Sequence, residues 1–478
     1  MSSGPQPAGA CLHGDSLPQP RARSTTSILV GAGLLSSCLY LSFALATRGN
    51  PLALALFPFR KGIIPGFLLH FLILFALYLA AAWCVFRCPE NRGSIAVTLL
   101  VFSAVFRVIL LWTQPVLSDD IYRYVWDGRV QAAGINPYLY PPEARELSHL
   151  RDDTIFPRIN RPSARTIYPA GAQWLFRAVF TARPDSVLFL KATIAVCDIL
   201  TILLLMRLLR TQGLSPGRAI LYAWHPLAVF ELAGSGHLDG LILPFLLVCL
   251  MCVGARRDSW AGASLGLATA IKLYPALLFP ALVRRHGLLL LVPASLVLGL
   301  VYLFYIVTAG QGVLGFLPQY LSDPEERFNS GPGALLAYGL GLLFSQPTPL
   351  AYAVLALALL AVGLRGSRTA DQGLNGTVAE VFLLFGTFVT FAQTVHPWYL
   401  LWIIPLLAIR PSASWLYLSG AIAISYVKYT SDSLHMPLWA GVLEYLPFYL
   451  LALWTARAGK FRLVGSGLIG QQAGRRTP

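Results

Sequence analysis

The sequence predicts an all-α polytopic membrane protein, and three observations support this fold class. Of 478 residues, 56% are hydrophobic and only 12% are charged, and the mean hydropathy is +0.64. An average soluble domain carries roughly 25% charged residues, so this chain lacks the polar surface that a soluble protein of its length needs. Long apolar segments recur along the chain, and basic residues gather between them. The composition excludes a soluble enzyme, a disordered protein and a secreted disulfide scaffold.

Twelve apolar segments, some of them short, approach the length of about 20 residues that a membrane-spanning helix needs. In chain order they are 27–47, 63–86, 94–114, 185–209, 218–236, 239–254, 287–308, 346–364, 377–394, 398–409, 412–428 and 438–456. They predict a single transmembrane domain over 27–456. The polar residues 1–26 predict a disordered N-terminus, and 457–478 predict a short C-terminal tail.

A further apolar segment, 259–283, has two interpretations. As one span, it places the basic pairs 256–257 and 284–285 on opposite sides of the membrane. As two half-helices that enter and leave around Lys272 and Pro275, it places every basic cluster on one side, as the positive-inside rule expects. The second, re-entrant interpretation predicts that both termini are cytoplasmic. We expect the membrane to be the plasma (inner) membrane. The net charge of +15 is then a topology signal rather than a nucleic-acid-binding patch.

Polar residues concentrate in one long loop, 115–184, on the opposite, external side. Loops of this length are usually functional or disordered, and the tyrosines and tryptophans here argue against disorder. Ser118 is the expected N-cap of a helix with Asp119 and Asp120 in its first turn, ending at Gly134. Its apolar positions share one face, which we expect on the membrane surface: Ile121, Val125, Gly128 and Ala132. A second amphipathic helix is predicted from Pro169 through Gln173 and Trp174 to Phe180.

Other segments bring polar groups to the same external side. The loop itself adds Arg158, Asn160, Arg161 and Tyr168, and the segments 236–240 and 394–399 add His237, Asp239, His396 and Tyr399. Such a cluster fits a substrate that is partly lipid and carries phosphate. Arginine and histidine would bind the phosphate, aromatic side chains would line a sugar, and a carboxylate would act as the base. Lys272 joins this set if the re-entrant tip reaches the pocket; the alternative is snorkelling to the interface.

Two alternatives stay open for the acidic pair Asp119 and Asp120. Carboxylates in a first helical turn can serve only to stabilise the helix dipole. A divalent metal would accept carboxylate ligands, but neighbours on a helix splay by roughly 100°, so other ligands would be needed. The sequence therefore predicts no firm metal site and no cofactor.

The motif Ser-Asp-Asp-Ile-Tyr-Arg-Tyr-Val-Trp-Asp-Gly at 118–128 resembles the GT-C superfamily of membrane glycosyltransferases. More narrowly, it is similar to their bacterial polyprenyl-phosphate-mannose-dependent mannosyltransferase branch. Further matches follow in the expected order at 134–138, 166–169 with Gln173, 236–240, 272–275 and 396–399. Two departures are that Asn160-Arg-Pro162 stands where the family often has Asn-His-Pro, and that a clean Asp-x-Asp motif is missing, so metal dependence does not carry over.

The resemblance implies an inverting transfer of a sugar, mannose by family, on the extracytoplasmic face. A hydroxyl of a lipid-linked or glycan acceptor would attack C1 while polyprenyl phosphate leaves. Asp119, which aligns with the leading aspartate, is the first candidate for the base and Asp120 the second. Arg123 would orient the base by an i, i+4 pair, and Asp127 would contact sugar or acceptor. The remaining candidates for substrate binding are Arg161, Tyr168, His237, Asp239, Lys272, His396 and Tyr399.

The alternative from another class is a secondary transporter or lipid flippase. Transporters place ionisable groups near the membrane midplane and often have inverted repeats with broken helices. The half-helices around Lys272 would suit a transporter. The polar residues, however, concentrate at one surface and no repeat is visible, which favours the glycosyltransferase.

Overall fold

A computed structural model describes residues 22–56, 62–87, 93–323, 326–366, 373–430 and 436–458. Every named element in these ranges is helical, and one isolated β-bridge joins Phe328 to Thr394. The all-α prediction therefore agrees with the structure. The first helix, α1, begins at Ala22, earlier than the predicted start at 27. The rest of the predicted N-terminal tail, and the C-terminal tail from 459 onward, lie outside the described residues.

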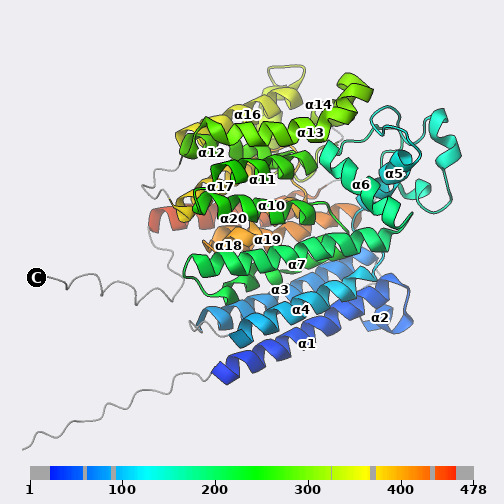
Figure 1. Cartoon of the computed structure of the whole chain (residues 1–478). Helices are drawn as coiled ribbons and strands as arrows, with labels where there is room; N and C mark the ends of the chain where they lie inside the picture. Colours follow the sequence, from blue (N-terminus) through cyan, green and yellow to red (C-terminus); the bar gives the residue numbers. More distant parts are fainter. Residues whose placement is uncertain are drawn as a thin grey trace, which may run out of the picture.

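Eight helices in the described ranges are long and apolar enough to cross a membrane, and they lie side by side in one bundle (Figure 1). They are α1 (Ala22–Thr47), α3 (Ile63–Arg87), α4 (Gly93–Leu111), α7 (Val187–Thr211), α13 (Leu291–Ala309), α16 (Pro347–Arg365), α17 (Leu374–Phe391) and α20 (Leu438–Ala458). Each coincides with one of the twelve predicted spans. Large apolar side chains remain exposed along them, as a lipid-facing surface requires.

The other four predicted spans are shorter or broken helices. They correspond to η4 (Pro216–Ala219), α8 (Ile220–Ala223), α9 (Pro226–Ala228) and η5 (Val229–Gly234); to α10 (Asp239–Gly254); to η10 (Pro397–Trp402) and α18 (Ile404–Leu407); and to α19 (Ala413–Ala421) and η11 (Ile422–Thr430). Every residue of 219–244 is buried. An apolar run of this kind reflects burial inside the protein, and hydropathy does not separate it from a lipid-facing span. The count of twelve spans stays a prediction.

The segment with two interpretations doubles back on itself. It forms α11 (Asp258–Ile271), η6 (Tyr274–Leu278) and α12 (Phe279–His286), with Lys272 in an extended conformation between the first two. The imidazole Nδ1 of His286 lies 2.9 Å from Asp258 Oδ1, so the segment ends where it began. This geometry is the one that a re-entrant pair requires, and its position in a bilayer stays a prediction.

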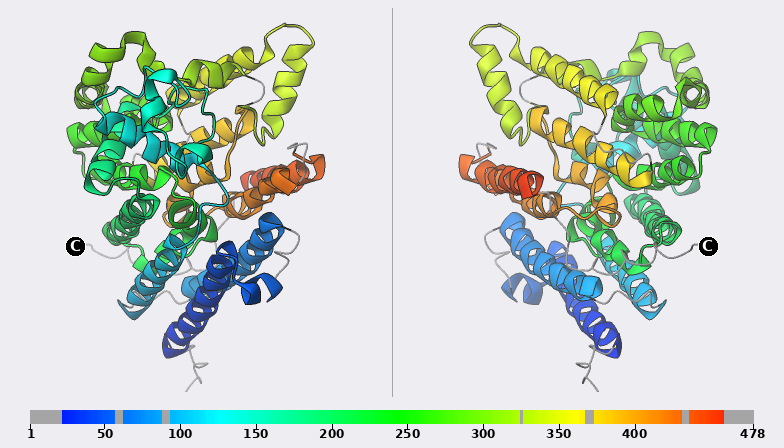
Figure 2. Two further views of the ribbon diagram at one scale, coloured as in Figure 1. Left: turned by 90° about the vertical axis from the view of Figure 1, so that its right-hand side faces the viewer. Right: turned by 90° about the vertical axis from the view of Figure 1, so that its left-hand side faces the viewer.

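The long loop after α4 forms a cap at one end of the bundle, built on α5 (Asp120–Ala132) and α6 (Ala170–Ala182), with η2 (Arg145–Leu150) and η3 (Phe156–Arg158) between them. In the left view of Figure 2, which faces this end, α5 and α6 lie over the green helices, apart from the dark blue α1. The remaining short elements are α2 (Pro51–Leu56), η7 (Leu288–Leu290), η8 (Gly310–Leu314), α14 (Leu317–Ser322) and α15 (Pro332–Gly341).

The apolar face of α5 does not lie on a membrane surface, so this expectation is wrong. Ile121 and Val125 are buried, and Gly128 lies so close to α6 that an added Cβ would be 2.6 Å from the Phe176 carbonyl oxygen. The face is apolar because it packs between α6 and the bundle. Hydrophobic spacing predicted the helix, but every residue from Ile121 to Gln131 is buried, so protein surrounds this helix on all sides.

Candidate active site

The two carboxylates at the start of α5 have different surroundings. Asp119, rather than Ser118, occupies the N-cap position, and its exposed side chain makes no capping hydrogen bond. Asp120 is held on one side by Asn160, whose Nδ2 donates to Oδ1 at 2.6 Å. Its other oxygen, Oδ2, lies 3.8 Å from Nδ1 of His237. Partial desolvation by the surrounding protein, and then the neighbouring Asp120 carboxylate, raise the pKa of Asp119. Asp119 is thus a carboxylate with enhanced basicity at an open position.

His237 reaches this position from a wide turn. The π-helical turn η5 ends at Gly234, and Gly236 has a left-handed backbone with φ of +79°. The His237 amide donates to the Glu231 carbonyl at 3.0 Å, which brings the two side chains together. Both are buried, and Nε2 of His237 lies 3.3 Å from Oε2 of Glu231. Tyr426 donates its hydroxyl hydrogen to the other Glu231 oxygen at 2.7 Å. Sequence reasoning missed Glu231.

A second acidic residue binds the predicted lysine. Asp239, fully buried in the first turn of α10, accepts from Lys272 Nζ at 2.7 Å and from the Trp402 indole N–H at 2.6 Å. The lysine ammonium also lies 5.5 Å from the centre of the Tyr399 ring. The extended backbone at Lys272, between α11 and η6, directs this side chain to the cluster. The structure thus places Lys272 with the predicted site residues.

Four rings stack beside these charges. His237 stacks on Trp398 at 3.8 Å between ring centres, Trp398 on His396 at 4.3 Å, and His396 on Phe328 at 4.7 Å. Burial, and then the charges of His237, Lys272 and Lys428, lower the pKa of His396 well below its usual range, so this ring is neutral. Phe328 was not predicted, and its contact depends on the β-bridge to Thr394, for which a single sequence carries no signal.

Arg123 and Asp127 lie inside the cap rather than in the cluster. Arg123 does form an i, i+4 pair, but its Nε donates to Asp127 Oδ1 at 2.9 Å instead of contacting Asp119. The other Asp127 oxygen accepts from Thr166 at 2.5 Å and from Gln173 at 2.8 Å. Both charged residues are buried. The predicted pairing of Arg123 with the base is therefore corrected: the arginine links α5 to the segment that leads into α6.

The last two predicted residues border the cluster. Arg161, with a positive φ of 53°, places Nε 2.5 Å from Glu326 Oε1, which ties the cap to the segment before α15. Tyr168 packs edge-on against Tyr124 at 4.8 Å between ring centres. Burial, and then the Asp120 charge, raise the pKa of Tyr168. Among the described residues, no three His, Cys, Asp or Glu side chains lie close enough to hold a metal ion.

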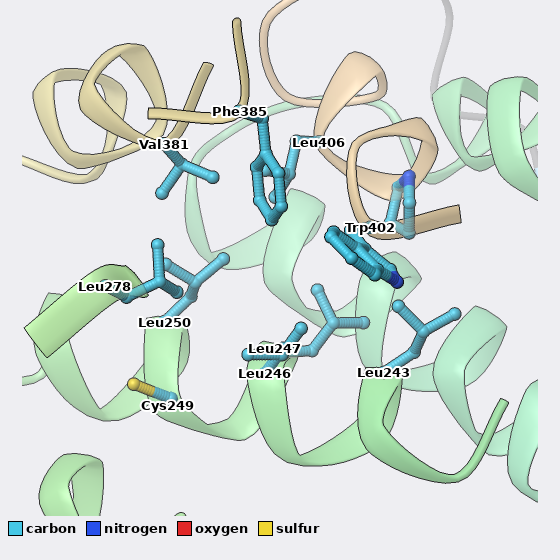
Figure 3. Close-up of a pocket in the computed structure, with 11 residues that line it drawn as sticks. Leu243, Leu246, Leu247, Cys249, Leu250, Leu278, Val381, Phe385, Trp402 and Leu406 are labelled. Atoms are coloured by element: carbon cyan, nitrogen blue, oxygen red, sulfur yellow. The ribbon is translucent and has the colours of Figure 1, made fainter. Parts of the chain in front are cut away.

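An apolar hollow adjoins the cluster through Trp402 (Figure 3). The indole that donates to Asp239 also lines this hollow, together with side chains of α10, η6, α17 and α18. The main lining residues are Leu243, Leu247, Leu250, Leu278, Phe385 and Leu406. The hollow is lined almost entirely by apolar atoms and lies next to the charged cluster.

Eight long apolar helices of the described ranges, with a cluster of acids, a lysine and stacked rings next to the cap at one end of the bundle, define a multi-pass membrane protein with a polar site. Residues 27–286, more than half of the chain, match the family described as alpha-(1->6)-mannopyranosyltransferase, N-terminal domain (MptA_B family). The chain belongs to this family, which confirms the predicted GT-C-like mannosyltransferase and supports mannosyl transfer as its activity. No curated protein and no solved structure matches the chain. The matched region holds every predicted site residue except His396 and Tyr399.

Proposed function

We propose that the protein is an inverting mannosyltransferase that uses a polyprenyl-phosphate-linked mannose donor. The acceptor is a hydroxyl of a lipid-linked or glycan substrate, and the reaction takes place at the extracytoplasmic face of the plasma membrane. The family supports the transfer of mannose. The observation that carries the rest is the position of Asp119, an open carboxylate of raised pKa whose neighbour Asp120 lies against the charged cluster through His237.

Asp119 is the base of the proposed reaction, and Asp120 is the second candidate. The Asp119 carboxylate takes the proton of the acceptor hydroxyl while that oxygen attacks C1 of the mannose. The bond between C1 and the phosphate oxygen breaks, and polyprenyl phosphate leaves from the opposite side, which inverts the configuration. A carboxylate with a raised pKa is a better base than an ordinary helix-start aspartate, because proton transfer depends on basicity as well as on position.

The phosphate and sugar of the donor would bind in the charged cluster, and its lipid chain would enter the apolar hollow. Lys272 is 22% exposed at its side chain and has three N–H donors, so it can bind phosphate while Asp239 holds it in place. His396 and Tyr399 would contact the sugar or phosphate, and the hollow beyond Trp402 would accept the first isoprene units. Arg161 and Tyr168, at the border of the cap, would contact the acceptor.

The orientation in the membrane follows from where the charges lie. The ion pair between His286 and Asp258 places the basic pairs 256–257 and 284–285 at one end of the bundle. A buried Glu380 binds Arg285 at 2.8 Å near that end. By the positive-inside rule this end is cytoplasmic, together with both termini. The segment 258–286 is then re-entrant, and the cap with Asp119 is extracytoplasmic.

The test is mannosyl transfer by the purified protein in lipid vesicles, with a labelled polyprenyl-phosphate mannose and a panel of lipid-linked acceptors. Asp119→Asn should reduce kcat by at least about 100-fold, the usual contribution of a general base. Asp153→Asn is the matched control, because Asp153 is an exposed aspartate of the same cap, and it should retain activity. Full activity in Asp119→Asn and loss in Asp120→Asn would move the base to Asp120. No transfer by the wild type, with transport of the lipid between leaflets, would favour a flippase.

A further inference from the structure

A buried glutamate, a buried histidine and a partly buried aspartate lie in sequence behind the proposed base. Glu231 Oε2 is 3.3 Å from one ring nitrogen of His237, and Asp120 Oδ2 is 3.8 Å from the other. We propose that Glu231 is a positioning residue of the transfer site, which holds His237 as an imidazolium cation beside Asp120. This inference rests on the proposed function and adds a residue that the transfer reaction needs but that does not touch the substrate.

The positions of the two ring nitrogens favour the cation. A neutral imidazole has one N–H and one lone pair, so it would present a lone pair to one of the two carboxylates. An imidazolium has an N–H on each side and can serve both Glu231 and Asp120. The face of Trp398, 3.8 Å away between ring centres, stabilises a positive ring further by a cation–π contact.

A cationic His237 would also stabilise Glu231 as a buried carboxylate. Its side chain is fully buried, and one oxygen is satisfied by the hydroxyl of Tyr426. Among the described residues, neither the other oxygen nor His237 Nε2 has a hydrogen-bond partner of good geometry. A buried carboxylate without a compensating charge is strongly unfavourable, so the ion pair with His237 is what allows Glu231 to be ionised there.

The local backbone is irregular where it places this pair. Wide π-helical turns occur as single insertions in helices and are frequent at functional sites. Here η5 and the left-handed Gly236 place His237 between Glu231 and Asp120 of α5.

The cation acts on the base through Asp120. An imidazolium 3.8 Å from Asp120 Oδ2 attracts this carboxylate and fixes its position, and the negative charge of Asp120 is one of the causes that raise the pKa of Asp119. A neutral ring would no longer hold the acidic pair in this arrangement. The groups that face His237 are Asp120 from α5, Glu231 from η5, and His396 with Trp398 from the segment around η10. The charges of Lys272 and Lys428 lower the pKa of His396, and these two lysines are the remaining charged groups, among the described residues, near the stacked rings of His237, Trp398 and His396.

The experiment compares the pH dependence of transfer in Glu231→Gln and in the wild type. The wild-type kcat should fall on the alkaline side as His237 loses its proton. In Glu231→Gln this limb should move to lower pH by about one unit, the usual effect of one opposite charge within ion-pair distance. The kcat on that side would then fall about tenfold while KM for the donor changes little. The same fall of kcat at alkaline pH must remain in His396→Gln. This result would exclude the neighbouring His396 imidazole as the cause of the fall.

Glu444→Gln is the matched control. Glu444 is also fully buried, with one oxygen bound to Asn329 at 2.7 Å and the other without a hydrogen-bond partner among the described residues. Its variant should lose stability as Glu231→Gln does, but keep the wild-type pH profile. The inference is overturned if the two variants have the same alkaline limb.

A second measurement does not depend on activity or on the folding of a glutamate variant. In a ¹⁵N-histidine spectrum of the wild-type protein at pH 7, the His237 signal, identified by its loss in His237→Gln, should show two protonated ring nitrogens. A neutral ring would overturn the inference. If the wild type transfers no mannose while His237 is protonated, the proposed function fails and the charge assignment stands, so the two failures are distinguishable.

Discussion

Two glycines with the same backbone conformation provide a test of how the turn before His237 positions the site. Gly236 has φ of +79° and Gly134 has φ of +80°, so alanine is strained at both positions. They differ in the space around them. A Cβ at Gly134 would have no atom within 4 Å, whereas a Cβ at Gly236 would overlap Ile121 Cδ1 and lie 3.2 Å from Lys191 Cγ.

The expected losses of stability follow from two contributions, the backbone strain of alanine at a positive φ and the overlap of its Cβ with neighbouring atoms. A left-handed conformation costs a residue with a Cβ about 1–2 kcal/mol, and this is the whole expected loss in Gly134→Ala. Overpacking of a filled interior adds about 1–3 kcal/mol, so Gly236→Ala should lose about 2–5 kcal/mol. Ile121 follows Asp120 directly, so relief of the overlap also displaces the acidic pair from His237. A displacement of about 1 Å at a reacting group can reduce the rate about 100-fold.

The assay is thermal unfolding of the two variants in one detergent, followed by mannosyl transfer in vesicles. We expect a larger drop in the apparent melting temperature for Gly236→Ala than for Gly134→Ala, and a loss of kcat in Gly236→Ala alone. Equal drops in melting temperature would show that the contact with Ile121 relaxes freely. Normal transfer by a destabilised Gly236→Ala would refute the reasoning that this turn positions the acids.

Two further predictions concern ion pairs. Hydrogen bonds from Arg129 lower the pKa of Asp152, so this pair stabilises the fold above the unfolded-state pKa of about 4, and the stability is lost as the pH falls through the lower folded-state pKa. Arg129→Met should therefore reduce stability at pH 7 and flatten the melting temperature below about pH 4; a curve parallel to the wild type would contradict this. Asp239→Asn leaves the ammonium of Lys272 without its partner and should lose about 3–5 kcal/mol. The double variant with Lys272→Met should lose less than the sum of the single losses in a double-mutant cycle, and additive losses would show that the pair is uncoupled.

Hydropathy predicted the spanning helices correctly where a segment is both long and apolar throughout. The eight such helices of the described ranges match predicted segments. It was ambiguous at the run 218–236, where proline and a π-helical turn break the helix and every residue from 219 onward is buried. Apolar composition reports removal from water, and the same composition results from lipid and from a protein interior.

The sequence predicted which side chains gather at the candidate site better than it predicted which of them contact each other. The segments that hold His237, Lys272 and His396 do meet in one place, although they are far apart in the sequence. Arg123 was assigned the wrong partner, because helical spacing places Asp119 and Asp127 equally well for an i, i+4 pair and does not tell which side of the helix is buried. Glu231 carried a signal that was not used: an ionisable residue inside an apolar run is by default a functional candidate.

Three basic side chains of the site, Lys272, Arg161 and His237, each lie against an acid, and this constrains how an anionic donor can bind. Lys272 contacts Asp239, Arg161 contacts Glu326, and His237 contacts Glu231. A donor phosphate therefore meets groups whose charge is largely balanced, and it gains hydrogen bonds from donors already held in place rather than a strong net attraction. Buried acids that orient cations in this way favour an arrangement matched to the charge that develops on the leaving phosphate, because fixed donors stabilise the transition state without reorganising. Substitution of these acids should then act on the rate of transfer more than on donor binding, which is the division that the pH and kcat measurements on Glu231 are designed to detect.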